Sequence, residues 1–498
     1  MKFGARMPCG HLGNRFAILR SRNHPLAKSH IIMYNANRFC EVKIMSDTIA
    51  AISTPVAAGG IGVIRISGDD AIAVADKAFN ATSGKKLSTL KGYTAAHGRI
   101  HIDGEDIDEG VALVFRSPKS YTGEDTVEIS CHGGVFVTNQ VLRAVLTAGA
   151  RPAEAGEFTK RAFLNGKMDL SEAEAVMSLI AAQGQQGMKA AMTALDGALS
   201  RKTDELCAKL ISASAHMAAW VDYPDEEIPE ISTENLEDIL KEVKGQLTGL
   251  LSKFDAGKAL TSGVDTAIVG KPNVGKSALM NMLSGFSRSI VTNIAGTTRD
   301  VVEETVRVGS VILRLADTAG IRESADIVES IGVDLARTRI ERAGLILAVF
   351  DGSAPLDDSD REIFELCRGR DVIAIVNKTD LPSNTDIEYI KSHFAETVFI
   401  SAMSHDGEDE LTKAIERVLG TDKIDTSKAM LTTERQRAST ISALESIDEA
   451  LNAIVIGITM DAINVCIDTA IDKLQELTGK KAKETVVDEV FSQFCVGK

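Results

Sequence analysis

The chain has 498 residues, of which 44% are hydrophobic and 25% are charged, and its formal net charge is −15. This length predicts two to four domains, and the composition is ordinary for a globular protein. Because an acidic chain repels polyanions, the net charge argues against diffuse binding to nucleic acid, so any RNA contact requires a local basic patch or a partner.

Two further classes are disfavoured. No run of 18 apolar residues occurs, so a transmembrane helix is not expected. The seven cysteines are scattered without a CxxC pair, which argues against a zinc ribbon or a disulfide framework. Free thiols suit a reducing compartment, and we expect a cytoplasmic protein.

The first segment, residues 1–44, is basic, with eight Lys or Arg residues and a single acid, Glu41. One explanation is an upstream translation start, with Met45 as the true initiator. The other is an organellar transit peptide, which would place the protein in the mitochondrial matrix. In either case the segment is left out of the fold prediction.

Residues 45–164 are rich in glycine and in short β-branched runs, and strands are predicted at Val63–Ile66, Gly110–Phe115 and Thr126–Ser130. Residues 165–262 read as helical, since Ala, Glu, Leu and Met dominate. An acidic loop containing Asp222, Tyr223, Pro224 and Pro229 is expected to interrupt the helices.

Residues 263–422 alternate short apolar strands with helices, which predicts a parallel, helix-covered sheet. The strands are expected at Val264–Val269, Val311–Leu315, Leu345–Phe350, Val372–Val376 and Val398–Ile400. Residues 423–498 return to helix. One apolar face comprises Ile441, Leu444, Ile447, Leu451 and Ile454, and a second comprises Ile463, Ile467, Ile471 and Leu474. Helix on both sides suggests an α/β module inserted in a helical domain; three domains in series is the alternative.

A phosphate-binding loop lies between the first of these strands and a helix. Residues Gly270 to Ser277 fit G-x-x-x-x-G-K-[ST]. The glycines let backbone N–H groups wrap phosphates, Lys276 supplies charge to the β- and γ-phosphates, and the Ser277 hydroxyl can ligate Mg²⁺. The nucleotide-binding residues predicted here are Asn273, Val274, Gly275, Lys276, Ser277 and Ala278.

Three more motifs follow in the order that a GTPase requires. Asp317, Thr318, Ala319 and Gly320 end a strand, where Asp317 can hold Mg²⁺ through water and the Gly320 N–H can sense the γ-phosphate. Asn377, Lys378, Thr379 and Asp380 end another. The Asp380 carboxylate can accept two hydrogen bonds from guanine, which adenine cannot supply, so the nucleotide is GTP. Ser401, Ala402 and Met403 are placed to offer a backbone N–H to the guanine carbonyl.

The residue after Gly320 is unusual. Small GTPases that orient water with glutamine carry it there, but Ile321 cannot polarise water. Another group must orient the attacking water, and the candidates are Glu323, Asp326 and Glu329.

From Met45 to Lys498 the chain resembles the MnmE (TrmE) family of tRNA-modification GTPases. The resemblance rests on Gly59–Gly68, Ser120–Asp125, Gly156–Lys167, the GTPase motifs and the end of the chain, Phe494-Cys495-Val496-Gly497-Lys498. The family ends on Cys-Ile-Gly-Lys, so Val496 is a one-methylene change that should matter little. The resemblance implies an α/β plus α+β multidomain fold, in which the P-loop GTPase domain is inserted in an all-α domain. A folate-binding-like domain would precede them and form a homodimer.

The resemblance also implies cofactors. Arg65, Glu128, Lys167 and Lys498 would contact a reduced folate, either 5,10-methylene- or 5-formyl-tetrahydrofolate. Hydrolysis would require K⁺ and paired GTPase domains, with K⁺ held by Asn273, Thr292, Ile294 and Thr297. The loop Thr292, Asn293, Ile294, Ala295, Gly296, Thr297 and Thr298 would complete the GTP site, Thr298 joining Ser277 at Mg²⁺. Glu329 would be the catalytic water-orienting acid, with Lys276 in its catalytic phosphate-binding role.

By the same resemblance, the protein would act with an FAD-dependent partner, MnmG, in a heterotetramer or larger complex. Together they would modify carbon 5 of the wobble uridine, position 34, of certain tRNAs with a folate-derived one-carbon unit. Cys495 could be a catalytic nucleophile or a merely structural thiol. Two other functions stay open: a regulatory or ribosome-assembly GTPase of the Era kind, and a folate-dependent transferase whose GTPase domain only regulates.

Overall fold

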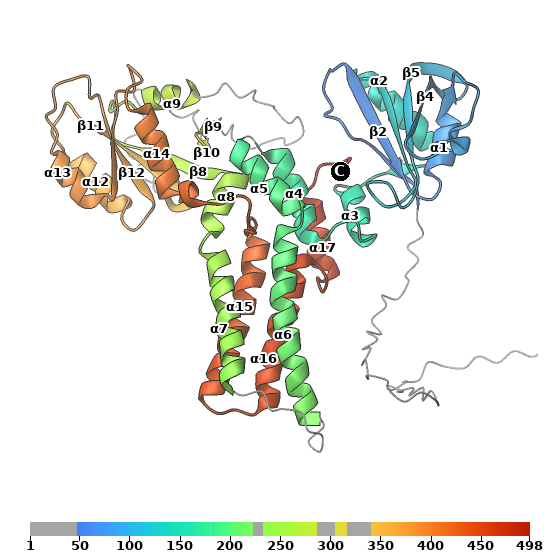
Figure 1. Ribbon diagram of the computed structural model, residues 1–498. Helices are drawn as coiled ribbons and strands as arrows, with labels where there is room; N and C mark the ends of the chain where they lie inside the picture. The colour runs from blue at the N-terminus through green and yellow to red at the C-terminus, as the bar shows by residue number, and fades with distance from the viewer. Residues whose placement is uncertain (1–46, 183, 223–232, 286–303, 316–339) are drawn as a thin grey trace, which may run out of the picture. The chain divides into compact units, whose positions relative to one another are not determined.

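The computed structural model describes the chain except for residues 1–46, 183, 223–232, 286–303 and 316–339 (Figure 1). The described residues belong to one compact unit, Asp47–Lys498. The basic segment 1–44 and most of the expected acidic loop lie outside the described residues. In the described part, none of the helices combines the length and apolarity needed to cross a bilayer.

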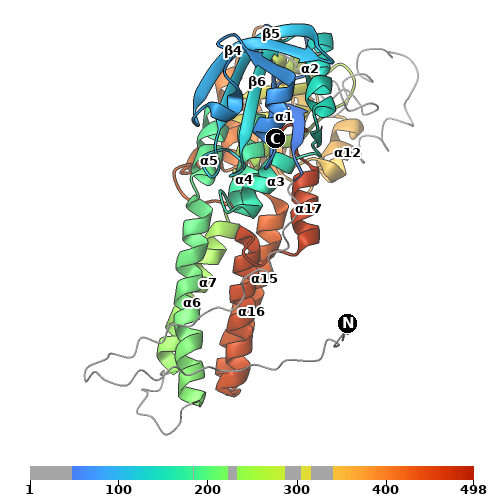
Figure 2. The ribbon, with the colours of Figure 1, turned by 90° about the vertical axis from the view of Figure 1, so that its right-hand side faces the viewer.

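The N-terminal part contains a sheet with strand order β3-β4-β5-β6-β2-β1-β7, packed against two helices (Figure 2). The strands are β1 (Ile49–Ile52), β2 (Ile61–Ser67), β3 (Phe79–Ala81), β4 (Thr94–Ile102), β5 (Glu105–Phe115), β6 (Thr126–His132) and β7 (Arg151–Pro152); the helices are α1 (Ala71–Ala78), α2 (Val135–Thr147) and the short 3₁₀ turn η1 (Leu87–Thr89). The three strands predicted here are confirmed as parts of β2, β5 and β6.

Strand alternation decides which side chains of this sheet face the core. In β2, Ile64 and Ile66 are fully buried, so Arg65 points to the opposite face. Antiparallel pairing of β2 with β6 places Arg65 directly across from Glu128. The sheet register therefore brings together two of the residues that were expected to bind folate.

Helices lie before and after the GTPase module, and four of them share one core. The helices on the two sides are α3 (Glu157–Leu164), α4 (Leu170–Ala181), α5 (Gln185–Leu195), α6 (Ala198–Asp222), α7 (Thr233–Leu251), α8 (Phe254–Ser262), α15 (Glu434–Val455), α16 (Met460–Thr478) and α17 (Glu484–Ser492). Side chains of α6, α7, α15 and α16 form a single hydrophobic cluster, and these helices run side by side (Figures 1 and 2). The insertion is confirmed, and three domains in series is wrong.

The predicted apolar face of α16 is confirmed, since Ile463, Ile467, Ile471 and Leu474 are all buried. The face predicted for α15 is confirmed in part, since Leu444, Leu451 and Ile454 are partly buried against the same hydrophobic cluster. Only Ile447 of its five residues is fully buried, whereas Ala443, Ala450 and Ala453 are buried beside it. Small side chains let this helix pack closely against its neighbours, which the apolar periodicity did not predict.

The GTPase module has strand order β13-β12-β11-β8-β10-β9. The strands are β8 (Val264–Val269), β9 (Glu304–Val308), β10 (Val311–Leu315), β11 (Leu345–Asp351), β12 (Val372–Asn377) and β13 (Glu396–Phe399), and the helices are α9 (Lys276–Gly285), α12 (Asp358–Leu366), α13 (Ile387–His393), α14 (Glu408–Val418) and the 3₁₀ turn η2 (Thr421–Lys423). The predicted strands pair in parallel, but β9, which was not predicted, pairs antiparallel with β10. The bounds predicted for the last strand were also wrong, because Ile400 follows β13.

Candidate functional site

The loop Gly270–Ser277 joins β8 to α9, and its backbone depends on glycine. Gly275 has a φ of +99°, and a Cβ there would lie 2.2 Å from Nδ2 of Asn377. At Gly270, with a φ of +158°, a Cβ would lie 2.6 Å from the Val349 carbonyl oxygen. Asn273 adopts a left-handed conformation with a φ of 65°, which asparagine tolerates better than most residues. The loop leads directly into the N-terminal end of α9, and backbone N–H groups at such a helix end can bind an anion.

Lys276 lies over this loop. Its Nζ donates hydrogen bonds to the carbonyl oxygens of Gly270, at 2.7 Å, and Lys271, at 2.8 Å. Burial lowers the pKa of the Lys276 ammonium. Val274 is buried beneath the loop, Ala278 is half-buried, and Ser277 is exposed at the start of α9. The structure therefore brings the predicted phosphate-binding residues together. Two carbonyl oxygens of the phosphate-binding loop hold Lys276 in place.

Asn377 connects two loops. Its Nδ2 donates to the Val274 carbonyl oxygen at 2.8 Å, and its Oδ1 accepts from the Ala402 N–H at 3.0 Å. The side chain is 2% exposed, so both hydrogen bonds are shielded from water. The residue was predicted only to bind nucleotide, yet it also ties the phosphate-binding loop to the loop expected at the guanine base.

The base-recognition residues lie beside one another. Oγ of Ser401 donates to Oδ1 of Asp380 at 2.7 Å, which orients one carboxylate oxygen. Lys378 has a φ of 67°, and its Nζ forms a 2.6 Å ion pair with Asp351. Asp380 itself is exposed, as is the Met403 side chain. An exposed, oriented carboxylate at the end of a strand is suited to the donor pair of guanine.

The other predicted GTPase residues lie outside the described part of the chain. They are Thr292, Asn293, Ile294, Ala295, Gly296, Thr297, Thr298, Asp317, Thr318, Ala319, Gly320 and Glu329. The described half of the site holds the phosphate-binding and base-recognition loops.

A second site forms where the end of the chain meets the N-terminal sheet. Val496 makes an antiparallel bridge with Ala155, and the Gly497 carbonyl oxygen accepts a 3.1 Å hydrogen bond from Oγ of Ser53. Gly497 has a φ of +97°, and a Cβ there would lie 2.3 Å from the Ile52 carbonyl oxygen. Only glycine permits this close approach. The sequence motif at the chain terminus therefore has a packing reason.

This docking brings Lys498 toward Arg65 and Glu128. Nε of Arg65 donates to Oε1 of Glu128 at 2.9 Å. Burial, and secondarily the positive charge of Arg65, lower the pKa of Lys498, whereas Glu128 acts in the opposite direction. A lysine with a lowered pKa beside a second cation gains from an anionic ligand, which relieves the repulsion.

Two aromatic rings hold the Arg65 guanidinium. Its Cζ lies 5.2 Å from the ring centroid of Tyr121 and 5.6 Å from that of Phe158, within cation–π range. Its Nη1 is buried and has no hydrogen-bond partner in the described residues. An unpaired guanidinium nitrogen is a costly group, and a polar ligand would satisfy it. The role of these two rings was missed, although both stand within motifs on which the resemblance rests.

Lys167 and Cys495 lie near the same elements. Nζ of Lys167 donates to the Pro118 carbonyl oxygen at 3.1 Å, and no hydrogen bond joins it to Arg65 or Glu128 in the described chain. The Cys495 thiol is exposed, and its carbonyl oxygen accepts weak hydrogen bonds from the N–H groups of Gly156 and Lys498. The structure thus brings Arg65, Glu128 and Lys498 together more clearly than it does Lys167.

Comparisons with known proteins identify the family of the chain. The family profile described as the MnmE helical domain matches residues 170–495, and that described as the GTP-binding protein TrmE N-terminus matches residues 48–167. The chain is 44% identical over 459 residues to the tRNA modification GTPase MnmE of Geobacillus thermodenitrificans, covering 91% of this chain and 99% of that protein. It is 42% identical over 459 residues to the Bacillus licheniformis MnmE, covering 91% and 100%.

Solved GTPase structures are similar over shorter stretches. A variant of Aquifex aeolicus Era bound to GDP and aluminium fluoride is 30% identical, with a TM-score of 0.25, covering 37% of this chain and 66% of that one. The GTPase domain of the Thermotoga maritima FeoB iron transporter is 26% identical, with a TM-score of 0.24, covering 31% and 98%.

Proposed function

Because this chain belongs to the MnmE family of tRNA-modification GTPases, we propose that its GTP hydrolysis serves one reaction, the modification of carbon 5 of the wobble uridine. In this proposal the protein is a homodimer that works with an FAD-dependent partner. The one-carbon unit comes from a reduced folate, and hydrolysis depends on K⁺. The domain bounds proposed are 45–164, 165–262, 263–422 and 423–498.

The observation that carries the folate assignment is the docking of the C-terminal tail beside Arg65 and Glu128. The cluster contains two cations, Arg65 and Lys498, which suit the carboxylates of a folate glutamate tail. It contains one carboxylate, Glu128, which suits the amino group of a pterin. The unpaired Nη1 of Arg65 supplies a donor that the protein itself leaves unused. When bound, the folate supplies the one-carbon unit, and these side chains bind and orient it.

The described part of the nucleotide site supports the metal assignments. Mg²⁺ is the usual partner of GTP, and the exposed Ser277 hydroxyl at the start of α9 can ligate it together with Thr298. Asn273 is exposed in the phosphate-binding loop, so its amide oxygen is available to a monovalent cation along with Thr292, Ile294 and Thr297. Such a cation supplies positive charge near the phosphates.

The glycine at position 497 offers the sharpest test of the folate assignment. Gly497→Ala should prevent the tail from docking, because the new Cβ would clash with the Ile52 carbonyl oxygen. We expect weaker binding of 5-formyl-tetrahydrofolate by calorimetry and loss of wobble modification by mass spectrometry of tRNA, with GTP hydrolysis unchanged. Gly457→Ala is the matched control, since Gly457 also has a positive φ, of 71°, but nothing lies within 4 Å of its Cβ position.

Two results would contradict the proposal. If folate fails to bind the unmodified protein, the cluster is an internal ion-pair set. If wobble uridine is fully modified in cells that lack this protein, a regulatory GTPase of the Era kind becomes the better assignment.

A further inference from the structure

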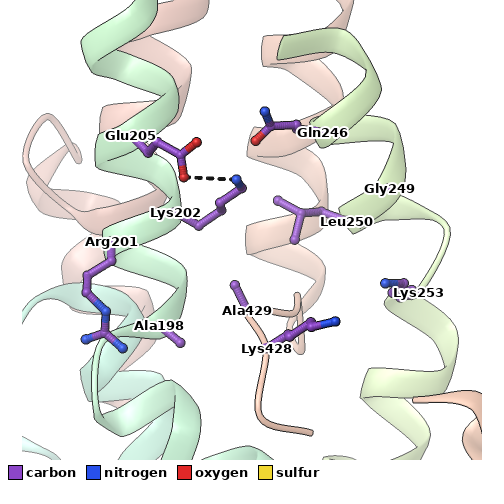
Figure 3. A pocket seen from close by; sticks show the side chains of 10 residues that line it. All are labelled: Ala198, Arg201, Lys202, Glu205, Gln246, Gly249, Leu250, Lys253, Lys428 and Ala429. Atoms are coloured by element: carbon purple, nitrogen blue, oxygen red, sulfur yellow. Dashed lines mark hydrogen bonds and ion pairs between the residues drawn. The ribbon is translucent and has the colours of Figure 1, made fainter. Parts of the chain in front are cut away.

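A basic cavity lies in the helical part of the molecule. It has a volume of about 520 Å³ and opens between α6, α7 and the segment that leads into α15 (Figure 3). Its lining residues are Ala198, Arg201, Lys202, Glu205, Gln246, Gly249, Leu250, Lys253, Lys428 and Ala429. Four are cationic and one is a carboxylate. In a chain with a net charge of −15, this is a local excess of positive charge.

The described protein neutralises this charge only in part. Glu205 pairs with Lys202 at 3.0 Å, and it is also shared with Lys209 outside the cavity, at 3.7 Å. Lys253 is exposed and forms no ion pair within the described residues. Lys428 lies 3.3 Å from Asp425, but its side chain remains 73% exposed. Exposed ion pairs of this kind contribute little to stability. An anionic ligand could therefore replace the carboxylate partners of these cations with little loss of folding free energy.

The lining also indicates which anion fits. Lysine and arginine bind phosphate oxygens, and none of the ten lining residues is an aromatic on which a base could stack. The cavity is therefore polar and suited to a phosphodiester backbone instead of a base.

We propose that this cavity binds backbone phosphates of the tRNA substrate, through Arg201, Lys202, Lys253 and Lys428. The inference rests on the family's role in tRNA modification. The cavity supplies a local basic patch, which is one of the two ways in which an acidic chain can contact RNA, the other being a partner protein. Such contacts position the RNA and carry no sequence information. None of the cavity residues belongs to the nucleotide-binding loops or to the cluster at Arg65, so RNA binding can be tested separately from both.

The test uses the full-length protein and an unmodified tRNA transcript. The double variant Lys253→Gln/Lys428→Gln removes two cavity charges. The control Lys241→Gln/Lys481→Gln removes two equally charged side chains, 60% and 51% exposed, that pair with Glu237 and Asp472 on other helix surfaces. We expect the cavity variant to bind tRNA roughly tenfold more weakly than the control. The slope of log K against log salt should fall by about 0.7–0.9 for each lost phosphate contact.

GTP hydrolysis by both variants should equal that of the unmodified protein, which verifies folding. An equal loss of tRNA affinity in both variants would show only a long-range charge effect. Unchanged tRNA affinity in both would show that the cavity does not bind RNA, and either result overturns the proposal. A parallel titration with inorganic phosphate distinguishes a small-anion site. If phosphate stabilises the protein through these lysines while tRNA affinity is unaffected, the cavity serves a free phosphorylated molecule and the proposal is wrong. Failure here leaves the folate assignment untouched.

Discussion

The side-chain amide of Asn377 donates a 2.8 Å hydrogen bond to the carbonyl oxygen of Val274, which lies more than a hundred positions earlier in the chain. One buried side chain thus couples the loop that surrounds the phosphates to the strand end that leads to Asp380. The Cβ of any residue at position 275 would strike this same amide. The shape of the phosphate-binding loop and the position of the predicted base-recognition residues therefore depend on the same side chain.

Asn377→Ala should loosen both loops. It leaves the Val274 carbonyl and the Ala402 N–H unpaired in a buried setting, which costs about 1–3 kcal/mol of folding stability. We expect a lower midpoint of thermal unfolding and GTP affinity reduced roughly tenfold or more. Asn384→Ala is the control, since that exposed amide only donates to the Ser353 carbonyl at 3.2 Å. Equal effects of the two variants would contradict the coupling.

Asp380→Asn should weaken guanine selectivity. The substitution places a donor opposite the donors of guanine, and the expected loss is about 2–4 kcal/mol of binding free energy. Xanthosine triphosphate, which carries a carbonyl where guanine has its amine, should recover much of the affinity. Asp358→Asn provides the comparison, because its side chain is 99% exposed. Unchanged GTP affinity in Asp380→Asn would show that guanine is recognised elsewhere.

Hydrolysis should be faster in K⁺ than in Na⁺, because a ring of carbonyl oxygens sized for K⁺ is too wide for Na⁺. Asn273→Gly removes the amide while keeping the backbone free to hold its φ of 65°. We expect this variant to bind GTP but to lose the preference for K⁺ and to hydrolyse roughly 10²-fold more slowly, as after loss of one preorganised stabilising group. Equal rates in the two salts for the unmodified protein would remove the K⁺ assignment.

Glu329→Ala should leave GTP binding nearly intact, since the residue is expected to contact water and not the nucleotide. Hydrolysis should slow by roughly 10²–10⁴, the usual range for a lost water-orienting group. Wobble modification should fall too if turnover is coupled to it. Glu323→Ala is the control from the same segment. If Glu329→Ala hydrolyses GTP normally, Glu323 and Asp326 become the candidates.

Cys495→Ser should leave GTP hydrolysis unchanged, because its exposed thiol belongs to the docked tail and to neither nucleotide loop. If the thiol is a nucleophile, wobble modification falls although the tail still docks and folate still binds. Mass spectrometry of tRNA measures wobble modification, and calorimetry measures folate binding. Normal modification in this variant would reduce Cys495 to a structural residue, with the GTPase assignment intact.

The nucleotide chemistry could be predicted from short segments of the sequence. Gly270–Ser277 and Asn377–Asp380 are contiguous motifs, each at the end of an apolar strand, and a parallel sheet brings such ends to one edge. The helices and strands that were predicted also followed from periodicity, because alternation and the 3.6-residue repeat are local properties.

Contacts between distant segments became visible only once the folded chain was known. The tail at Gly497 docks on Ile52, and Lys253 and Lys428 line the same cavity, because separate elements pack that way and no local pattern encodes the pairing. The same holds for α15, where Ala443 and Ala450 are buried in place of Ile441. Hydrophobicity predicts that a helix has a buried face, but the approach of its neighbours selects which side chains fit there.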